Sequence, residues 1–155
     1  KSATFANFMT AAYTNFDLIV IDLGSISNFA IKLTDRRWNS QCLIWSSDNC
    51  DEIWINSRPD EVGRFRLARL IQELSKNKIK AKLQFVANLE VPRRRNDHGA
   101  HDLAEQIDQL NPINRFTLPR DNRAVAAAAT SSSALSEASP KSMLRKAICK
   151  IAIEV

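Results

Sequence analysis

The residues best placed to do chemistry in this chain each stand at the end of a predicted strand. Asp22 ends one strand, Asn88 follows a second, and the Pro-Arg-Asp turn at residues 119–121 follows a third. In open α/β sheets, ligands bind at the carboxyl ends of the strands. A carboxylate there can help to hold a divalent cation, and an amide offers both a hydrogen-bond donor and an acceptor. These residues therefore predict a ligand-binding edge.

Each of these residues also has a purely structural alternative. Asp22 could serve as a cap or turn residue, and Asn88 could be a turn residue at the end of a strand. Asp121 could accept the N-cap hydrogen bond of the helix that follows it, and this role is compatible with ligand binding.

The elements that must position these residues alternate between strands and helices. Short apolar runs predict strands at residues 17–22, 53–55, 81–87 and 114–118. Helical patterns lie before, between and after these runs, and the histidine-rich stretch at residues 97–102 is expected to form a solvated loop because of Gly99. This alternation predicts an α/β fold with a mainly parallel sheet flanked by helices, in one domain of residues 1–155.

Helical spacing also predicts which apolar side chains face the core. The first helix, at residues 2–13, should present Phe5, Phe8, Met9 and Ala12 on one face. A second helix should begin with Ser57 as its hydroxyl cap and an early proline. Its predicted apolar side consists of Val62, Phe65, Leu70, Ile71 and Leu74.

Composition and charge exclude several classes of protein. No apolar run approaches the roughly 18 residues that span a bilayer, so a cytoplasmic location is expected. The three cysteines, Cys42, Cys50 and Cys149, include no CxxC pair, which argues against a disulfide framework and a zinc site. A net charge of +5 permits contact with nucleic acid or with anionic lipid.

The motifs, taken in order, resemble those of the MinD/ParA-like P-loop ATPases, and within them the CpaE/TadZ group of pilus assembly. The resemblance is to the C-terminal half of that domain. It rests on an Asp-bounded strand, an "rPd"-type turn, a strand that ends in Asn, an "lPrD"-type turn with alanines, and an "LxExxPxS"-type end. These motifs correspond to residues 16–24, 51–60, 85–88, 118–129 and 135–142.

The resemblance implies a role for each candidate site residue. Asp22 matches the Walker B position and would orient Mg²⁺ through water. Asn88 matches the asparagine that hydrogen-bonds the adenine edge. Pro119, Arg120 and Asp121 match the loop that borders the base on its other side. ATP or ADP and Mg²⁺ are the implied cofactors of the complete domain.

The phosphate-binding loop of this family is missing from the sequence. Glycine occurs only at Gly24, Gly63 and Gly99, so a GxxxxGK[ST] loop cannot be formed. The resemblance therefore implies that ATP hydrolysis requires an N-terminal Walker A segment. Residues 26–50 do not match the family pattern cleanly.

Three hypotheses of function follow from the resemblance. The first is an ATPase that positions a pilus or secretion apparatus by nucleotide-dependent homodimerisation. The second is a degenerate binding module that recruits partners without hydrolysis, and the third is a DNA-partitioning ATPase.

Some surface features leave both a functional and a structural alternative open. A basic patch for nonspecific DNA contact would consist of residues 93–95 with Arg115, Arg120 and Arg123, although unrelated surface charges are favoured. The terminal helix could rest on an anionic membrane surface or pack on the sheet. His98 and His101 could bind a metal, but a solvated loop is favoured.

Overall fold

The computed structural model describes residues 2–24, 45–76, 79–90 and 98–154. The chain divides into two compact units. The first unit comprises residues 1–53 and 68–82, and the second comprises residues 54–67 and 83–155. The expectation of one domain over residues 1–155 stays a prediction.

A three-stranded parallel sheet has the strand order β1-β2-β3. Its strands are β1 (Glu52–Ser57), β2 (Lys82–Glu90) and β3 (Asn114–Pro119). The central strand β2 is buried on both faces from residue 84 to residue 87, as is typical of a parallel strand covered by helices on both sides. The strands predicted at residues 53–55, 81–87 and 114–118 are thus confirmed.

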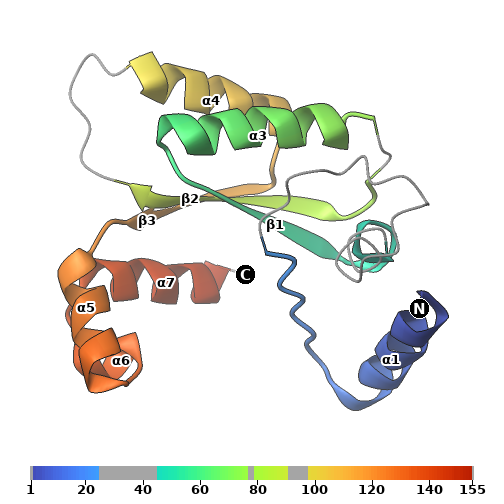
Figure 1. Cartoon of the computed structure of the whole chain (residues 1–155), viewed down its shortest axis with the longest axis horizontal. Helices are drawn as coiled ribbons and strands as arrows, with labels where there is room; N and C mark the ends of the chain where they lie inside the picture. The colour runs from blue at the N-terminus through green and yellow to red at the C-terminus, as the bar shows by residue number, and fades with distance from the viewer. Residues whose placement is uncertain (1, 25–44, 77–78, 91–97, 155) are drawn as a thin grey trace. The chain divides into compact units, whose positions relative to one another are not determined.

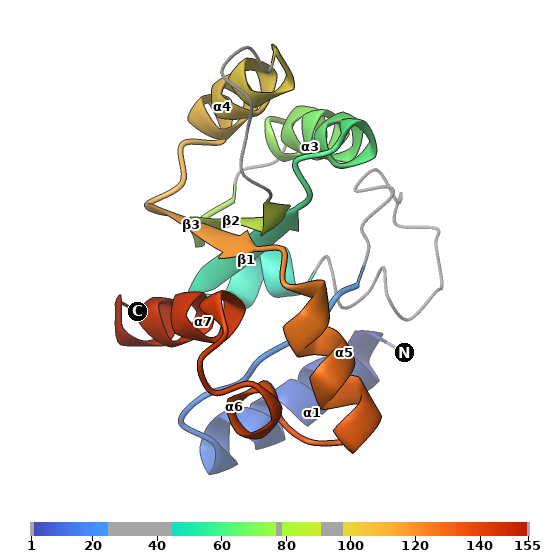
Figure 2. The same ribbon diagram turned by 90° about the vertical axis from the view of Figure 1, so that its left-hand side faces the viewer.

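Helices lie on both faces of the sheet in the second unit (Figures 1 and 2). The helix α4 (His98–Leu110) lies on one face, and α7 (Met143–Glu154) lies on the other and contacts β3. On the α4 side, Arg115 of β3 forms an ion pair of 2.7 Å with Asp108. Further helices are α1 (Ser2–Asn15), α3 (Glu61–Leu74), α5 (Asn122–Ser131) and α6 (Leu135–Ala138). The predicted α/β fold is confirmed.

Different side chains pack on the two faces of the sheet. On the α4 face, Phe85 of β2 and Leu103 of α4 are the largest fully buried side chains among the described residues. Because side chains alternate along a strand, Phe116 lies on the opposite face from its neighbour Arg115. There its ring stacks on that of Trp54 from β1, with centroids 5.5 Å apart and planes 6° apart.

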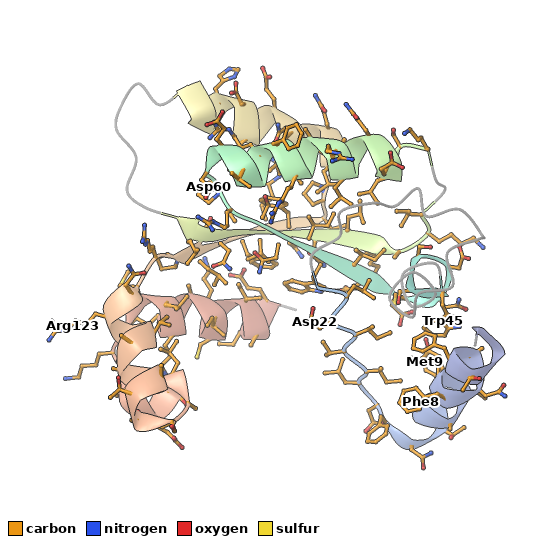
Figure 3. The ribbon with its side chains drawn as sticks, viewed as in Figure 1. Phe8, Met9, Asp22, Trp45, Asp60 and Arg123 are labelled. Carbon is orange, nitrogen blue, oxygen red and sulfur yellow. The ribbon has the colours of Figure 1, made fainter. Side chains whose placement is uncertain are left out.

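The core of the first unit is built on α1. Phe5 and Met9 are buried, and Ile19, Ile21, Leu23 and Trp45 pack against them. The rings of Phe5 and Trp45 meet edge to face at 5.4 Å. Figure 3 shows Met9 and Trp45 close together at α1. The inclusion of Phe8 in the buried face is wrong, since its side chain is 64% exposed. Residues 5, 9 and 12 form the buried stripe, and position 8 lies beside it.

The strand predicted at residues 17–22 is absent from the structure. The chain there is extended, but its backbone forms no hydrogen bond with any other described residue outside the Asp22 turn. Ile19 and Ile21 cover the α1 core, whereas Leu18 and Val20 on the other side are 80% and 83% exposed. The sequence has the pattern of a doubly buried strand, but a strand needs a neighbour, and no described segment pairs with it.

The start of α3 also differs from the prediction. The cap is Asp60, not Ser57: the Gly63 N–H donates to Asp60 Oδ1 at 2.8 Å, and the Arg64 N–H donates to the Asp60 carbonyl at 2.9 Å. A residue before proline disfavours helical geometry, so the helix begins only after Pro59.

The buried stripe of α3 runs through a glycine. Gly63 and Leu67 are buried, whereas Val62 and Phe65 are 58% and 64% exposed, so the predicted apolar side is wrong at its first two positions. A Cβ on Gly63 would collide with the Arg58 carbonyl oxygen. This turn of α3 therefore packs with its backbone rather than with a side chain.

Gly99 lies inside α4, so the predicted loop around the histidines is wrong. A Cβ on Gly99 would collide with the guanidinium of Arg64, which donates to the Pro59 carbonyl at 2.9 Å. The end of the Arg64 side chain thus lies against Gly99, and α4 forms there despite the low helix propensity of glycine.

Candidate functional site

Asn88 lies near the carboxyl end of the central strand. The residues before it in β2 are buried, and Asn88 itself is half-buried. It is paired with Leu118 of β3. Leu118 shares a face with Phe116, so Asn88 lies on the face of the sheet opposite α4. Its side-chain amide forms no hydrogen bond with another described residue, which leaves its donor and acceptor free for a ligand.

The register of β2 against β3 changes directly after Asn88. Glu90, not Leu89, is paired with Pro119, and Leu89 has a φ of 60° in the left-handed region. This β-bulge brings the end of β2 to Pro119. The structure therefore brings together two of the predicted site residues, Asn88 and Pro119, at neighbouring strand ends.

The turn after β3 leads directly into α5. Asp121 is the N-cap of this helix, and its Oδ1 accepts a hydrogen bond of 3.0 Å from the Ala124 N–H. Arg120 Nε donates to Asn122 Oδ1 at 3.2 Å. The structural role predicted for Asp121 is thus confirmed. The cap fixes the turn relative to α5, and so defines the rim beside Pro119.

Asp22 belongs to the first unit, in the extended chain that leads away from α1 (Figure 3). Its carboxylate is exposed, and Oδ1 accepts a hydrogen bond of 2.8 Å from the Gly24 N–H. Gly24 has a φ of 64°, a conformation that glycine adopts without strain. The turn fixes one carboxylate oxygen and leaves the other for a water or a cation. Because Asp22 and Asn88 belong to different units, their common edge stays a prediction.

The described arginines of the predicted basic patch have different surroundings. Arg115 pairs with Asp108 on the α4 side, and Arg120 contacts Asn122 at the turn. Arg123 points away from α5 into solvent (Figure 3). Residues 93–95 lie outside the described residues. A DNA-binding patch therefore stays a prediction.

The described residues contain no group of three His, Cys, Asp or Glu side chains that could hold a metal ion. His101 instead lies 3.3 Å from Glu105 on the exposed side of α4. None of the helices in the described ranges is long and apolar enough to cross a membrane. The contact of α7 with β3 agrees with the structural alternative for the terminal helix.

One feature of this site was missed by sequence reasoning. Leu89 is an ordinary residue in an apolar run, and leucine rarely adopts a positive φ. The one sequence signal for the end of regular strand pairing was Pro119, because proline has no N–H to donate to a neighbouring strand.

Comparison with known proteins identifies the fold. No family model and no curated protein matches the chain. Among solved structures, the chain is similar to a ParA family ATPase from Chlorobium tepidum TLS, with a TM-score of 0.75 and 18% sequence identity. The match covers 99% of this chain and 56% of the ATPase chain, so this chain spans just over half the length of that protein. The predicted MinD/ParA-like fold is confirmed, whereas the CpaE/TadZ group and the C-terminal half stay predictions.

Proposed function

We propose that this chain supplies the base-contacting part of an ATPase domain of the MinD/ParA type. The observation that carries the proposal is the pairing of Asn88 with Leu118 beside Pro119, at the carboxyl ends of adjacent parallel strands. This is where open α/β sheets bind ligands. In the proposed site, the Asn88 amide hydrogen-bonds the adenine edge, and residues 119–121 border the base.

The residues present fit a nucleobase and a hydrated cation, but not a triphosphate. The Asn88 amide has both a donor and an acceptor, as an adenine edge requires. Asp22 keeps a carboxylate oxygen that can accept a hydrogen bond from a Mg²⁺-bound water. The phosphates need a cradle of backbone N–H groups and a lysine, and the three glycines of the sequence cannot form the glycine-rich loop.

The chain's own residues therefore bind and orient the base, and in the complete domain Mg²⁺ would neutralise charge on the phosphates. We assign hydrolysis only to a domain in which a Walker A segment is also present. The biological role that we propose is nucleotide-dependent homodimerisation that positions a pilus or secretion apparatus, in the cytoplasm or at the inner membrane surface.

A second candidate function is a binding module that recruits partners without hydrolysis. This candidate requires no glycine-rich loop, and the three glycines of the sequence form none. The two candidates differ in whether a nucleobase binds at Asn88.

Calorimetry of the chain with ATP tests the proposal. A few hydrogen bonds contribute about 0.5–1.5 kcal/mol each, which is small beside the roughly 4–15 kcal/mol that immobilising a ligand costs. We expect ATP to bind with a Kd no lower than about 1 mM, with little help from Mg²⁺. The backbone amide shift of Leu118, the residue paired with Asn88, should nevertheless respond to adenosine in NMR spectra.

The matched variants are Asn88→Ala, which should abolish this response, and Asn114→Ala at the other end of the sheet, which should keep it. A micromolar, Mg²⁺-dependent isotherm would contradict the proposal, since it would require phosphate ligands elsewhere in the chain. An adenosine response that survives in Asn88→Ala would contradict the assignment of the base contact.

A further inference from the structure

We propose that Leu89 is a positioning residue that sets the direction of the Asn88 amide and thereby the preference for adenine. The inference rests on the nucleotide-binding function proposed above. It starts from the backbone of Leu89, whose φ of 60° is one of three positive values among the non-glycine residues described. The other two, at Asn111 and Ser132, follow helix ends, where this conformation is common.

The side chain of Leu89 offsets little of the energetic cost of its left-handed backbone conformation. A left-handed backbone crowds the Cβ of any L-residue, and leucine has no short polar side chain to compensate by a local hydrogen bond. The side chain is 38% exposed, so its burial is incomplete. Glycine or asparagine would adopt the same backbone at lower cost. Such outliers cluster at ligand sites, where the surrounding structure holds them in place.

The bulge changes where the regular pairing ends. In an unbroken register, Leu89 would be paired with Pro119. Instead Leu89 is left out of the register and Glu90 takes that place, which makes Asn88 the last regularly paired residue of β2 before the bulge. Bulges beside active sites re-aim a neighbouring side chain or end strand pairing. Here the bulge does both, because it ends the ladder and fixes the strand direction at Asn88.

Three substitutions at one position separate positioning from packing. Leu89→Gly and Leu89→Asn both remove the leucine side chain but tolerate a positive φ. Leu89→Val keeps an apolar side chain, but valine is β-branched and strongly disfavours a positive φ. If Leu89 acted through packing, the first two variants would be impaired and the valine variant would be the mildest. If Leu89 acts through its backbone, the valine variant should be the most impaired and the glycine and asparagine variants the mildest.

The readout is the preference of the chain for adenosine over guanosine, measured as the ratio of the two Kd values in NMR titrations. We expect Leu89→Gly and Leu89→Asn to keep the wild-type ratio within a factor of two. In Leu89→Val the ratio should fall to about one, while slow amide exchange at Phe85 and Val86 shows that β2 remains folded.

Two results would overturn the inference alone. One is a wild-type ratio in a folded Leu89→Val protein, and the other is loss of preference in both Leu89→Gly and Leu89→Asn. Absence of any adenosine response in the wild-type chain would instead refute the proposed function, and the inference would fall with it.

Discussion

Leu18 and Val20 lie on the exposed side of an extended segment whose other side is packed, so substitutions at neighbouring positions should change the stability by unequal amounts. Replacing Leu18 and Val20 together by serine removes apolar surface that is already in contact with water. We expect the free energy of unfolding to change by no more than about 0.5 kcal/mol per site. Replacing Ile19 and Ile21 by alanine opens the α1 core. Because these two are only partly buried, we expect about 1–2 kcal/mol each, roughly half the cost of a fully buried isoleucine.

The same exposed side chains should drive association. Covering a leucine or valine stabilises by about 1.5–3 kcal/mol, so a partner strand that covers both residues gains about 3–6 kcal/mol. This corresponds to a hundredfold to roughly ten-thousandfold in affinity. The backbone groups of the segment, unpaired with any described residue, would add to it. We therefore expect this chain on its own to self-associate or to be poorly soluble.

Sedimentation velocity over a concentration series, with urea unfolding followed by tryptophan fluorescence, measures both effects. The double serine variant should sediment as a smaller species than the wild type at equal concentration and should unfold at a similar urea concentration. The reasoning fails if the wild-type chain is a monomer at every concentration. It also fails if the serine variant associates as strongly as the wild type.

Three smaller predictions concern single contacts. Asp121→Ala should cost about 1 kcal/mol through loss of the N-cap of α5, measured by urea unfolding, whereas Asp121→Asn should retain most of it. Gly63→Ala should destabilise by about 1–3 kcal/mol, because the Cβ meets the Arg58 carbonyl oxygen, although alanine favours helix; a gain in stability would contradict this packing. Burial, with smaller contributions from a neighbouring thiolate and carboxylate, raises the pKa of Tyr13, the single tyrosine, above 10.0. Ultraviolet titration should show this directly, and stability should fall above pH 10.0, because the unfolded chain loses its proton first.

The sheet and the base-side half of the candidate site could be predicted from the sequence. Residues 85–87 form a short apolar run that ends in Asn88, and such a run is typical of a buried strand in a parallel sheet. Parallel pairing then determines that Asn88 and Pro119 meet, because the carboxyl ends of neighbouring parallel strands lie at one edge.

Other features depended on contacts that apolar spacing does not encode. Residues 17–22 have the apolar run of a doubly buried strand, but a strand forms only against a neighbour. Gly63 packs against the backbone of Arg58, so counting apolar side chains placed the buried side of α3 wrongly. The positive φ of Leu89 could not be predicted from its residue type, because leucine rarely adopts this backbone conformation.

The stacked rings of Trp54 and Phe116 join the two outer strands of the sheet on the face that also carries Asn88. On this face Gln84 and Val86 of β2 are only 3% and 6% exposed. A planar base bound at Asn88, as proposed above, would therefore find no open surface over these two residues. Its orientation would depend on the few polar atoms at the last residues of the strand.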